Sequence, residues 1–280
     1  MNRFFETLYD GYGQTFDIEE VLYEEKTEHQ HVLIFQNVLF GRVMALDGVV
    51  QTTEKDEFIY HEMLAHVPIL AHGRVSRVLI IGGGDGGTAR EVLRHLVPHT
   101  VTLVEIDETV LRACREHLPT IGTCWDDPRL ELIVGNGVSY VEHANAAYYD
   151  LVIIDGCDPV GPARGLFSVE FYRACERLLR PGGALALQAG SPILQHDQFI
   201  ETIANLRQVF PRERVKPYFG PAPLYASDLW SWALASHELD WHAIIEDRAA
   251  RVEPHTKYYN REIHRAAFAL PNNLKRELGA

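Results

Sequence analysis

Four carboxylates lie where the sequence predicts ligand chemistry, each at or just beyond the end of an apolar run. Asp85 follows the first of these runs, Glu105 ends the second, and Asp155 and Asp158 follow a later one. In an α/β sheet the carboxyl ends of the parallel strands form the edge where ligands bind. The pair Asp155 and Asp158 invites an ammonium group or a metal ion, or provides a general base for an amine nucleophile. The alternative is an Asx turn ahead of Pro159, although the strand-end position favours function.

The loop that carries Asp85 contains little besides glycine. It follows the apolar run 78–81 and satisfies Gly-x-Gly-x-x-Gly at Gly82, Gly84 and Gly87. A strand, such a loop and a helix in succession let backbone N–H groups approach a ligand closely. The pattern alone has little specificity, because many nucleotide-binding folds carry it. Asp85 would repel a pyrophosphate, so this loop favours a cationic or neutral ligand.

Two further strand ends carry residues suited to a nucleoside. Glu105 lies twenty residues after Asp85, where a doubly wound sheet directs a carboxylate at ribose hydroxyls; the alternative is a capping or surface acid. Asn136 lies between Gly135 and Gly137, so the chain can pass close to a flat ring while the amide offers an acceptor to an exocyclic amino group. An ordinary turn explains the same three residues.

Several aromatic residues could line a cationic or apolar slot. Tyr60, Tyr225 and Trp230 are candidates, although most aromatic side chains belong to the core. His61 is either a ligand contact or a structural histidine of its helix.

Composition narrows the class of protein. The chain has 280 residues, 46% of them hydrophobic, and a formal net charge of −13 from 26 basic and 39 acidic residues. This charge argues against nucleic acid or an anionic membrane as partner and suits a cationic substrate, or solubility alone. The four cysteines, Cys114, Cys124, Cys157 and Cys175, form no CxxC pair, and no signal-peptide core or bilayer-spanning run is present. We therefore expect a reduced, cytoplasmic protein without structural zinc or disulfides.

The elements that must position these residues follow two patterns. Residues 1 to about 50 are β-rich, with a hairpin turn signal at Asp47-Gly48, and residues 56–72 predict a helix with an apolar face, closed by Gly73. From residue 75 strands and helices alternate, which predicts a mostly parallel sheet covered on both faces. The expected strands are 78–81, 101–106, 130–134, 151–154, 184–188, 214–218 and 230–235. The expected helices are 88–95, 108–118, a short one near 139, 168–179 and 197–209, followed by a docked tail, 258–280, with one helix from about residue 272.

Together these residues resemble the polyamine aminopropyltransferases, the bacterial spermidine synthases in particular. The matching segments are Leu-Asp-Gly-Val-Val-Gln-Thr-Thr-Glu-Lys-Asp-Glu-Phe-Ile-Tyr-His-Glu-Met at 46–63, Ile-Ile-Gly-Gly-Gly-Asp-Gly-Gly at 80–87, Leu-Val-Glu-Ile-Asp at 103–107, 155–162, Arg-Pro-Gly-Gly at 180–183 and 258–271. The resemblance covers nearly the whole chain, and its combination of segments is far more specific than the glycine loop.

The resemblance implies a fold, a reaction and an assembly. It implies an α/β fold in which a small N-terminal β domain, 1–55, precedes a Rossmann-like, methyltransferase-type doubly wound catalytic domain, 56–280. It implies transfer of the aminopropyl group of decarboxylated S-adenosylmethionine, a co-substrate, to putrescine, giving spermidine and 5′-methylthioadenosine without a metal or other cofactor. It also implies a homodimer or homotetramer.

The resemblance also assigns roles. Asp155 is expected to accept the proton of the attacking amine, while Asp158, Tyr60 and Tyr225 hold the diamine. Asp85 is expected to face the aminopropyl ammonium of the donor, which His61 also approaches. The expected nucleoside contacts are Gln30, Gly82, Gly84, Glu105, Asn136, Gly137 and Pro162.

Two departures from the family pattern affect recognition. The family usually has Asp at the position where this chain has Asn136, so the charge-assisted hydrogen bond to the adenine amino group is weaker here. The family's Tyr-Pro-Ser-Gly stretch reads Tyr225-Ala-Ser-Asp228 in this chain, near the diamine end. The acceptor therefore stays open among putrescine, cadaverine, agmatine and longer polyamines.

Three other functions use the same residues. A methyltransferase would share the nucleoside pocket, but Asp85 would repel the carboxylate of ordinary S-adenosylmethionine. A nicotinamide dehydrogenase would share the glycine pattern and Glu105, but Asp85 would face its pyrophosphate. A polyamine-binding sensor would keep the acidic pocket without the chemistry.

Overall fold

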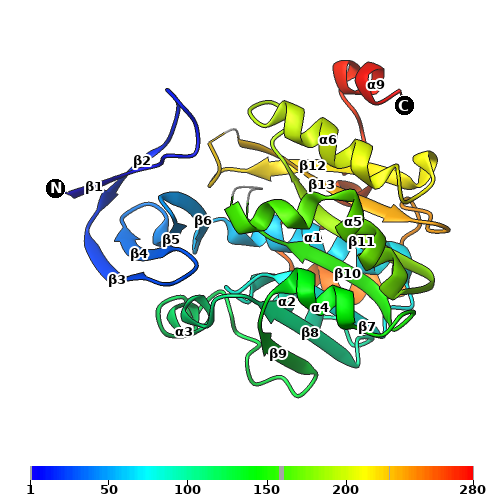
Figure 1. Cartoon of the computed structure of the whole chain (residues 1–280), viewed down its shortest axis with the longest axis horizontal. Helices are drawn as coiled ribbons and strands as arrows, with labels where there is room; N and C mark the ends of the chain where they lie inside the picture. Colours follow the sequence, from blue (N-terminus) through cyan, green and yellow to red (C-terminus); the bar gives the residue numbers. More distant parts are fainter. Residues whose placement is uncertain (1, 158–160, 227, 280) are drawn as a thin grey trace.

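The computed structural model describes residues 2–157, 161–226 and 228–279, and its centre is a seven-stranded sheet (Figure 1). The strands lie in the order β12-β13-β11-β10-β7-β8-β9. Only β13 runs against the others in this described sheet, pairing antiparallel with both β11 and β12. Their bounds are β7 (Arg77–Gly82), β8 (Thr100–Glu105), β9 (Leu130–Val134), β10 (Tyr149–Asp155), β11 (Leu179–Gly190), β12 (Val215–Ala222) and β13 (Asp228–Ser236).

Helices cover both faces of this sheet, because its strands are apolar on both sides. Along β7, Val78 and Ile80 point into one hydrophobic cluster, whereas Leu79 and Ile81 point into the other. The first cluster contains residues of α1 (Glu57–His72), α2 (Gly87–Leu93), α7 (Glu246–Val252) and α8 (Arg261–Ala267). The second contains residues of α4 (Gly137–His143), α5 (Val169–Leu178), α6 (His196–Leu206) and α9 (Asn272–Leu278).

The winding reverses between β7 and β10, which are neighbours in the sheet although two strands separate them in sequence. Their last paired residues are Gly82 and Asp155. Since crevices open at the carboxyl ends beside such a switch point, the glycine loop and Asp155 meet where α/β folds bind ligands. The predicted Rossmann-like, doubly wound fold class with a small N-terminal β domain is confirmed.

The N-terminal part forms two antiparallel sheets beside this edge (Figure 1). One pairs β1 (Asn2–Phe5) with β2 (Thr15–Ile18), and the other has the order β3 (Glu20–Lys26), β4 (His31–Asn37), β5 (Gly41–Leu46), β6 (Val49–Thr53). The predicted hairpin joins β5 to β6 through Asp47 and Gly48, both at positive φ. One face of the larger sheet packs on α3 (Glu108–His117), with Ile34, Met44 and Cys114 in the shared cluster. The predicted boundary at residue 55 falls between β6 and α1, and the division into domains stays a prediction.

Two predicted elements differ from the structure. Helix α1 has no single apolar face, because nearly every residue from Ile59 to Ala71 is buried, including His61, Glu62 and His66. The sequence predicts one helix in the C-terminal tail, but the structure has α8 before α9 there. Periodicity missed α8 because it has only seven residues and buries only His264 and Ala267. The remaining short helices are η1 (Gly161–Phe167), η2 (Arg212–Arg214) and η3 (Glu253–His255).

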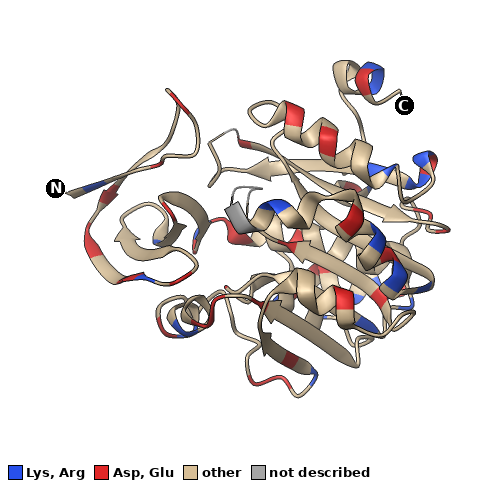
Figure 2. Cartoon of the chain, in the orientation of Figure 1, with Lys and Arg blue, Asp and Glu red and all other residues tan. Residues whose placement is uncertain are grey.

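The excess of acidic residues is spread over several elements. Figure 2 shows acidic segments on β3 and α6, whereas α5 and α9 mix both signs. The net charge of −13 therefore does not by itself locate a binding surface. Among the helices of the described chain, none has both the length and the apolar character needed to cross a bilayer.

Glu62 joins α1 to the C-terminal segment and provides a test of this packing. Its buried carboxylate accepts hydrogen bonds from the backbone N–H groups of Lys257, Tyr258 and Tyr259 at 2.8, 2.8 and 2.7 Å. Glu62→Gln places an amide N–H₂ against a backbone donor, so we expect the free energy of unfolding to fall by about 1–3 kcal/mol in urea titrations. Glu28→Gln, at an exposed carboxylate, is the control. Equal stability of the two variants would contradict the role of Glu62.

Candidate active site

A cavity of about 440 Å³ lies between the N-terminal strands, α1 and the carboxyl edge of the central sheet. The strand ends deliver one part of its lining, α1 a second and the hairpin β5–β6 a third. Eleven of the predicted site residues line it: Gln30, Tyr60, His61, Gly82, Gly84, Asp85, Glu105, Asn136, Gly137, Asp155 and Tyr225.

Three of the sequence candidates are not placed in this cavity. Asp158 lies outside the described residues. Pro162 lies in η1, where its side chain is not described. Trp230 is buried, with its ring centroid 4.2 Å from that of Tyr225, so it supports an aromatic residue of the cavity wall.

The glycines of the loop are required by the protein's own side chains. A Cβ on Gly83 would lie 2.8 Å from Asp155 Oδ2, and one on Gly84 would lie 3.0 Å from Glu105 Oε2. A Cβ on Gly87 would lie 2.3 Å from two ring atoms of His61. The loop is therefore pressed between β8, β10 and α1, and only residues without a side chain leave room for these groups.

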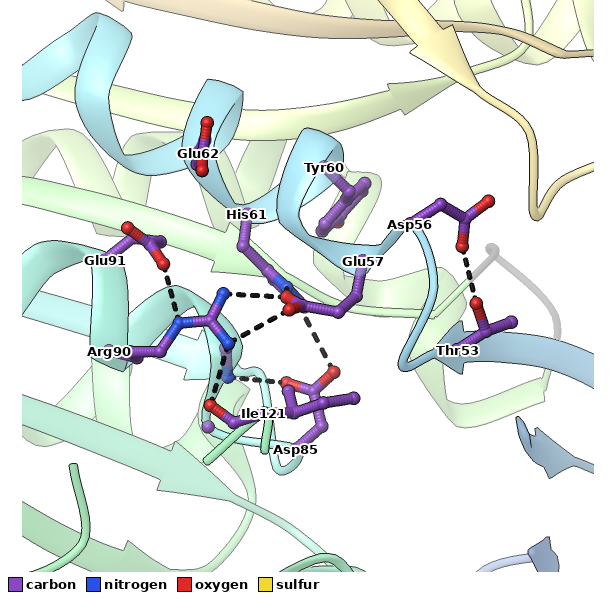
Figure 3. Close-up of polar contacts among 12 residues, drawn as sticks. Thr53, Asp56, Glu57, Tyr60, His61, Glu62, Asp85, Arg90, Glu91 and Ile121 are labelled. Carbon is purple, nitrogen blue, oxygen red and sulfur yellow. Dashed lines mark hydrogen bonds and ion pairs between the residues drawn. The ribbon is translucent and has the colours of Figure 1, made fainter. Parts of the chain in front are cut away.

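Asp85 is held by His61 and by its own loop (Figure 3). Its Oδ1 accepts a hydrogen bond from Gly87 N at 2.9 Å, and its Oδ2 lies 3.3 Å from His61 Nε2. Burial raises the pKa of Asp85, but the charge and hydrogen bond of His61 and the Gly87 N–H outweigh burial, so the pKa lies below its usual range. Asp85 is thus an ionised carboxylate at the cavity wall.

Asp155 differs from Asp85 in its surroundings. Its Oδ1 accepts a hydrogen bond from the Tyr60 hydroxyl at 2.8 Å, and its Oδ2 is buried against the glycine loop. Burial and the negative charge of Asp85 raise the pKa of Asp155, and His61, Thr88 and Tyr60 only partly offset them. The site therefore holds two aspartates with opposite pKa shifts, an arrangement that suits one fixed charge and one proton acceptor.

Aromatic rings form the wall beside Asp155. The rings of Tyr60 and Tyr225 meet edge to face, with centroids 6.1 Å apart, and Trp232 packs behind Tyr60 at 5.8 Å. The Tyr225 hydroxyl donates to the carbonyl of Gln51 on β6 at 3.2 Å. Aromatic faces beside carboxylates can bind an alkyl chain that ends in an ammonium group.

The opposite end of the cavity carries Glu105 and Asn136. Glu105 is buried and accepts a hydrogen bond from Asp107 N at 2.9 Å. Burial raises its pKa to about 7. Asn136 caps α4, because its Oδ1 accepts hydrogen bonds from Val138 N and Ser139 N at 2.9 and 3.1 Å. The acceptor expected to face a base is therefore occupied, and the amide nitrogen is the group left for a ligand.

Sequence reasoning missed several contributors to the site. Thr7, Leu8 and Gln51 line the cavity from N-terminal strands and loops, where no local pattern marks them. Glu57 contacts His61 on the side away from the cavity, and it is not among the predicted site residues. Its spacing of four residues from His61 on a predicted helix does indicate that the two side chains can pair. Gln30 lines the cavity as expected and also donates from Nε2 to Asp107 at 3.1 Å.

Comparison with known proteins covers the whole chain. A family model described as "Spermine/spermidine synthase domain" matches residues 57–244, and one described as "Spermidine synthase tetramerisation domain" matches residues 3–54. Polyamine aminopropyltransferase 1 of Pseudomonas aeruginosa is 46% identical over 284 residues, covering 100% of this chain and 98% of the relative. A polyamine aminopropyltransferase of Klebsiella pneumoniae is 47% identical over 280 residues, covering 98% and 97%.

Solved structures show the same architecture. A spermidine synthase in complex with the transition state analogue AdoDATO superimposes with a TM-score of 0.95 at 39% identity, covering 99% of this chain and 95% of that one. The spermidine synthase from Thermotoga maritima gives a TM-score of 0.94 at 39% identity, covering 100% and 94%. The agreement extends through both the N-terminal strands and the central sheet.

Glu105 makes stability depend on pH in a defined direction. Its pKa is about 7 in the folded chain and 4.5 when exposed, so the native state binds more protons than the unfolded state between these values. The contribution of Glu105 to the free energy of unfolding is complete below about pH 4.5 and is lost as the pH rises through about 7. The loss amounts to about 3 kcal/mol. Glu105→Gln should remove this part of the pH dependence in urea unfolding measured from about pH 4.5 to 8. Parallel curves for the variant and the native chain would contradict the assignment.

Proposed function

The chain belongs to the spermine/spermidine synthase family, and from this premise we propose that it transfers the aminopropyl group of decarboxylated S-adenosylmethionine to putrescine, giving spermidine and 5′-methylthioadenosine. One observation carries the proposal. Asp85 and Asp155 line one cavity with opposite pKa shifts, the first suited to a fixed ammonium group and the second to a proton in transfer. The relatives are named polyamine aminopropyltransferases, which supports the group transferred.

The donor supplies its own reactivity. Its sulfonium makes the adjacent methylene carbon electrophilic, so the attacking amine forms an N–C bond while the C–S bond breaks and its electron pair stays on sulfur. The protein has to hold the amine in line with the breaking bond, and such positioning is worth about 7–11 kcal/mol. The rings of Tyr60 and Tyr225 beside Asp155 provide the slot for the diamine, with Asp158 as a further contact proposed from the family pattern.

Asp155 is the proton acceptor in this proposal. An amine has a pKa of about 10 and must lose a proton before or during attack. The raised pKa of Asp155 brings its carboxylate closer to the working pH, while the Tyr60 hydroxyl on Oδ1 holds the carboxylate in place.

Asp85 selects the donor. Its ionised carboxylate, held by His61, would bind the aminopropyl ammonium of the decarboxylated nucleoside. The same charge would repel the carboxylate of ordinary S-adenosylmethionine, which disfavours methyl transfer.

The nucleoside lies at the other end of the cavity. We place the ribose hydroxyls on Glu105 and Gln30 and the base beside Asn136, with the backbone of the three cavity glycines and of the η1 segment closing around them. The glycines are Gly82, Gly84 and Gly137, and the η1 residue is Pro162.

The N-terminal strands provide the surface for assembly. Val38 and Leu39, in the turn between β4 and β5, expose 80% and 63% of their surface, and Phe5 on β1 exposes 62%. Residues 3–54 match the tetramerisation model. Apolar side chains so exposed on a strand-rich unit favour pairing between copies, so we propose a homodimer or homotetramer formed through this part.

The reaction and the base are tested together. Purified protein with decarboxylated S-adenosylmethionine and a panel of putrescine, cadaverine, agmatine and spermidine should release methylthioadenosine fastest with putrescine. Asp155→Asn should lower kcat by at least about 10²-fold. Asp150→Asn is the control, because Asp150 lies at the far end of β10 and holds Ser76 N and Arg77 N.

If none of the amines supports release of methylthioadenosine, aminopropyl transfer is rejected. If another amine gives faster release than putrescine, that amine is the acceptor. Near-normal turnover of the Asp155 variant would remove its role as base.

Base recognition gives a separate prediction. In Asn136→Asp one carboxylate oxygen can cap α4 while the other accepts from the 6-amino group of adenine, so methylthioadenosine should bind about tenfold more tightly, as measured by calorimetry. The 6-oxo analogue methylthioinosine should bind the variant more weakly, since carboxylate and carbonyl oxygen repel. Unchanged affinities for both nucleosides would place the base elsewhere.

A further inference from the structure

A chain of buried ion pairs extends from the cavity into the protein through His61 (Figure 3). His61 Nδ1 lies 2.6 Å from Glu57 Oε2, one helical turn earlier on α1. Arg90 on α2 donates from Nη1 and Nη2 to the two oxygens of Glu57 at 3.1 and 2.8 Å. Glu57, His61 and Arg90 are all less than 9% exposed. Such a bidentate pair fixes the plane of the carboxylate as well as its position.

Arg90 is itself fixed on its other side. Its Nε donates to Glu91 Oε1 at 2.6 Å, and Nη1 also donates to the carbonyl of Ile121 at 2.9 Å. Glu91 is buried, and its second oxygen lies 2.6 Å from Arg94 and 3.1 Å from His66. The position of Glu57 is therefore set by packed groups of α2 and not by solvent.

The imidazole of His61 has little freedom to turn. Its ring lies against Gly87, where any Cβ would clash, and its edge meets the ring of Tyr60 at 5.3 Å. Carboxylates face both ring nitrogens, Glu57 at Nδ1 and Asp85 at Nε2. A neutral imidazole can donate from only one nitrogen, so two carboxylates facing the two ring nitrogens favour the imidazolium. The charged or titratable groups around the ring are Glu57 and Tyr60 of α1, Asp85 of the loop, Arg90 of α2 and Asp155 of β10.

We propose that Glu57, clamped by Arg90, is a positioning residue that holds His61 as a doubly donating imidazolium and thereby assigns different tasks to Asp85 and Asp155. The inference rests on the proposed function for those two tasks. Its geometric basis, two carboxylates on one buried ring with a guanidinium behind, is independent of it.

The directions of the pKa shifts agree with this proposal. Burial lowers the pKa of His61, but the charges and hydrogen bonds of Asp85 and Glu57 outweigh burial and raise it well above its usual range. Burial raises the pKa of Glu57, and His61 and Arg90 outweigh it in turn, so that pKa is lowered. An imidazolium at Asp85 keeps that carboxylate ionised for the donor's ammonium, and Asp155, without a cation in direct contact among the described residues, carries the raised pKa.

Glu57→Gln tests the proposal, with Glu62→Gln as a matched control. Both residues are buried carboxylates of α1, but Glu62 faces the C-terminal segment. In Glu57→Gln we expect the acidic limb of kcat/KM for decarboxylated S-adenosylmethionine to move up by about one pH unit, because Asp85 loses its cation. Binding of methylthioadenosine, which has no ammonium group, should change less than about twofold. Glu62→Gln should lose stability without moving the limb.

A second readout does not depend on turnover. In NMR spectra of the native chain both ring N–H groups of His61 should persist from about pH 6 to 9, and in Glu57→Gln the ring should titrate within that range. If Glu57→Gln does not fold, Arg90→Lys retains the charge but not the bidentate pair and should give a smaller shift of the same sign.

Persistence of the imidazolium in Glu57→Gln, or equal limb shifts in Glu57→Gln and Glu62→Gln, would overturn the inference. If the native chain shows no turnover, but its His61 ring stays doubly protonated and the ring of Glu57→Gln titrates as expected, the proposed function alone is rejected.

Discussion

Burial of carboxylates at one edge of the central sheet is the constraint on which the rest of this structure depends. Asp85, Glu105 and Asp155 line one cavity, and like charges there raise one another's pKa unless each finds a partner. The three solve this differently. Asp85 has the His61 imidazolium and Asp155 has the Tyr60 hydroxyl, whereas Glu105 accepts from the backbone N–H of Asp107 and has a pKa of about 7. The pKa shifts of these three carboxylates therefore differ mainly because their hydrogen-bonding and ionic partners differ.

The glycine loop follows from the same constraint. A pattern shared with nucleotide-binding folds suggests backbone that closes on a ligand. Here Gly83, Gly84 and Gly87 make room for Asp155, Glu105 and His61 in turn. Side chains from β10, β8 and α1 therefore lie against one short turn of backbone, and Asp85 comes from the loop itself. The glycines thus leave the space in which these charged side chains pack, independently of any ligand.

Helix α1 supplies the positive counterpart and explains its own unusual composition. It is buried on all sides, so its polar residues each need a partner. Tyr60 and His61 face the cavity, Glu57 faces α2 and Glu62 faces the C-terminal segment. One helix therefore links the residues that contact the two aspartates to α2 and to the C-terminal segment.

The sequence by itself determined the alternation of strands and helices, the carboxylates at strand ends and, through the family segments, eleven of the residues that line the cavity. These depend on local periodicity and on the rule that parallel strands share a carboxyl edge. Only the tertiary structure decided the partners. Tyr60 and Asp155 are 95 residues apart and Arg90 and Glu57 are 33 apart, so no local pattern relates them. Whether Asn136 offers oxygen or nitrogen depended on the cap of α4, and α8 was hidden because its few buried residues leave no periodic signal. Pairing follows from which surfaces pack together, and packing is a property of the whole chain.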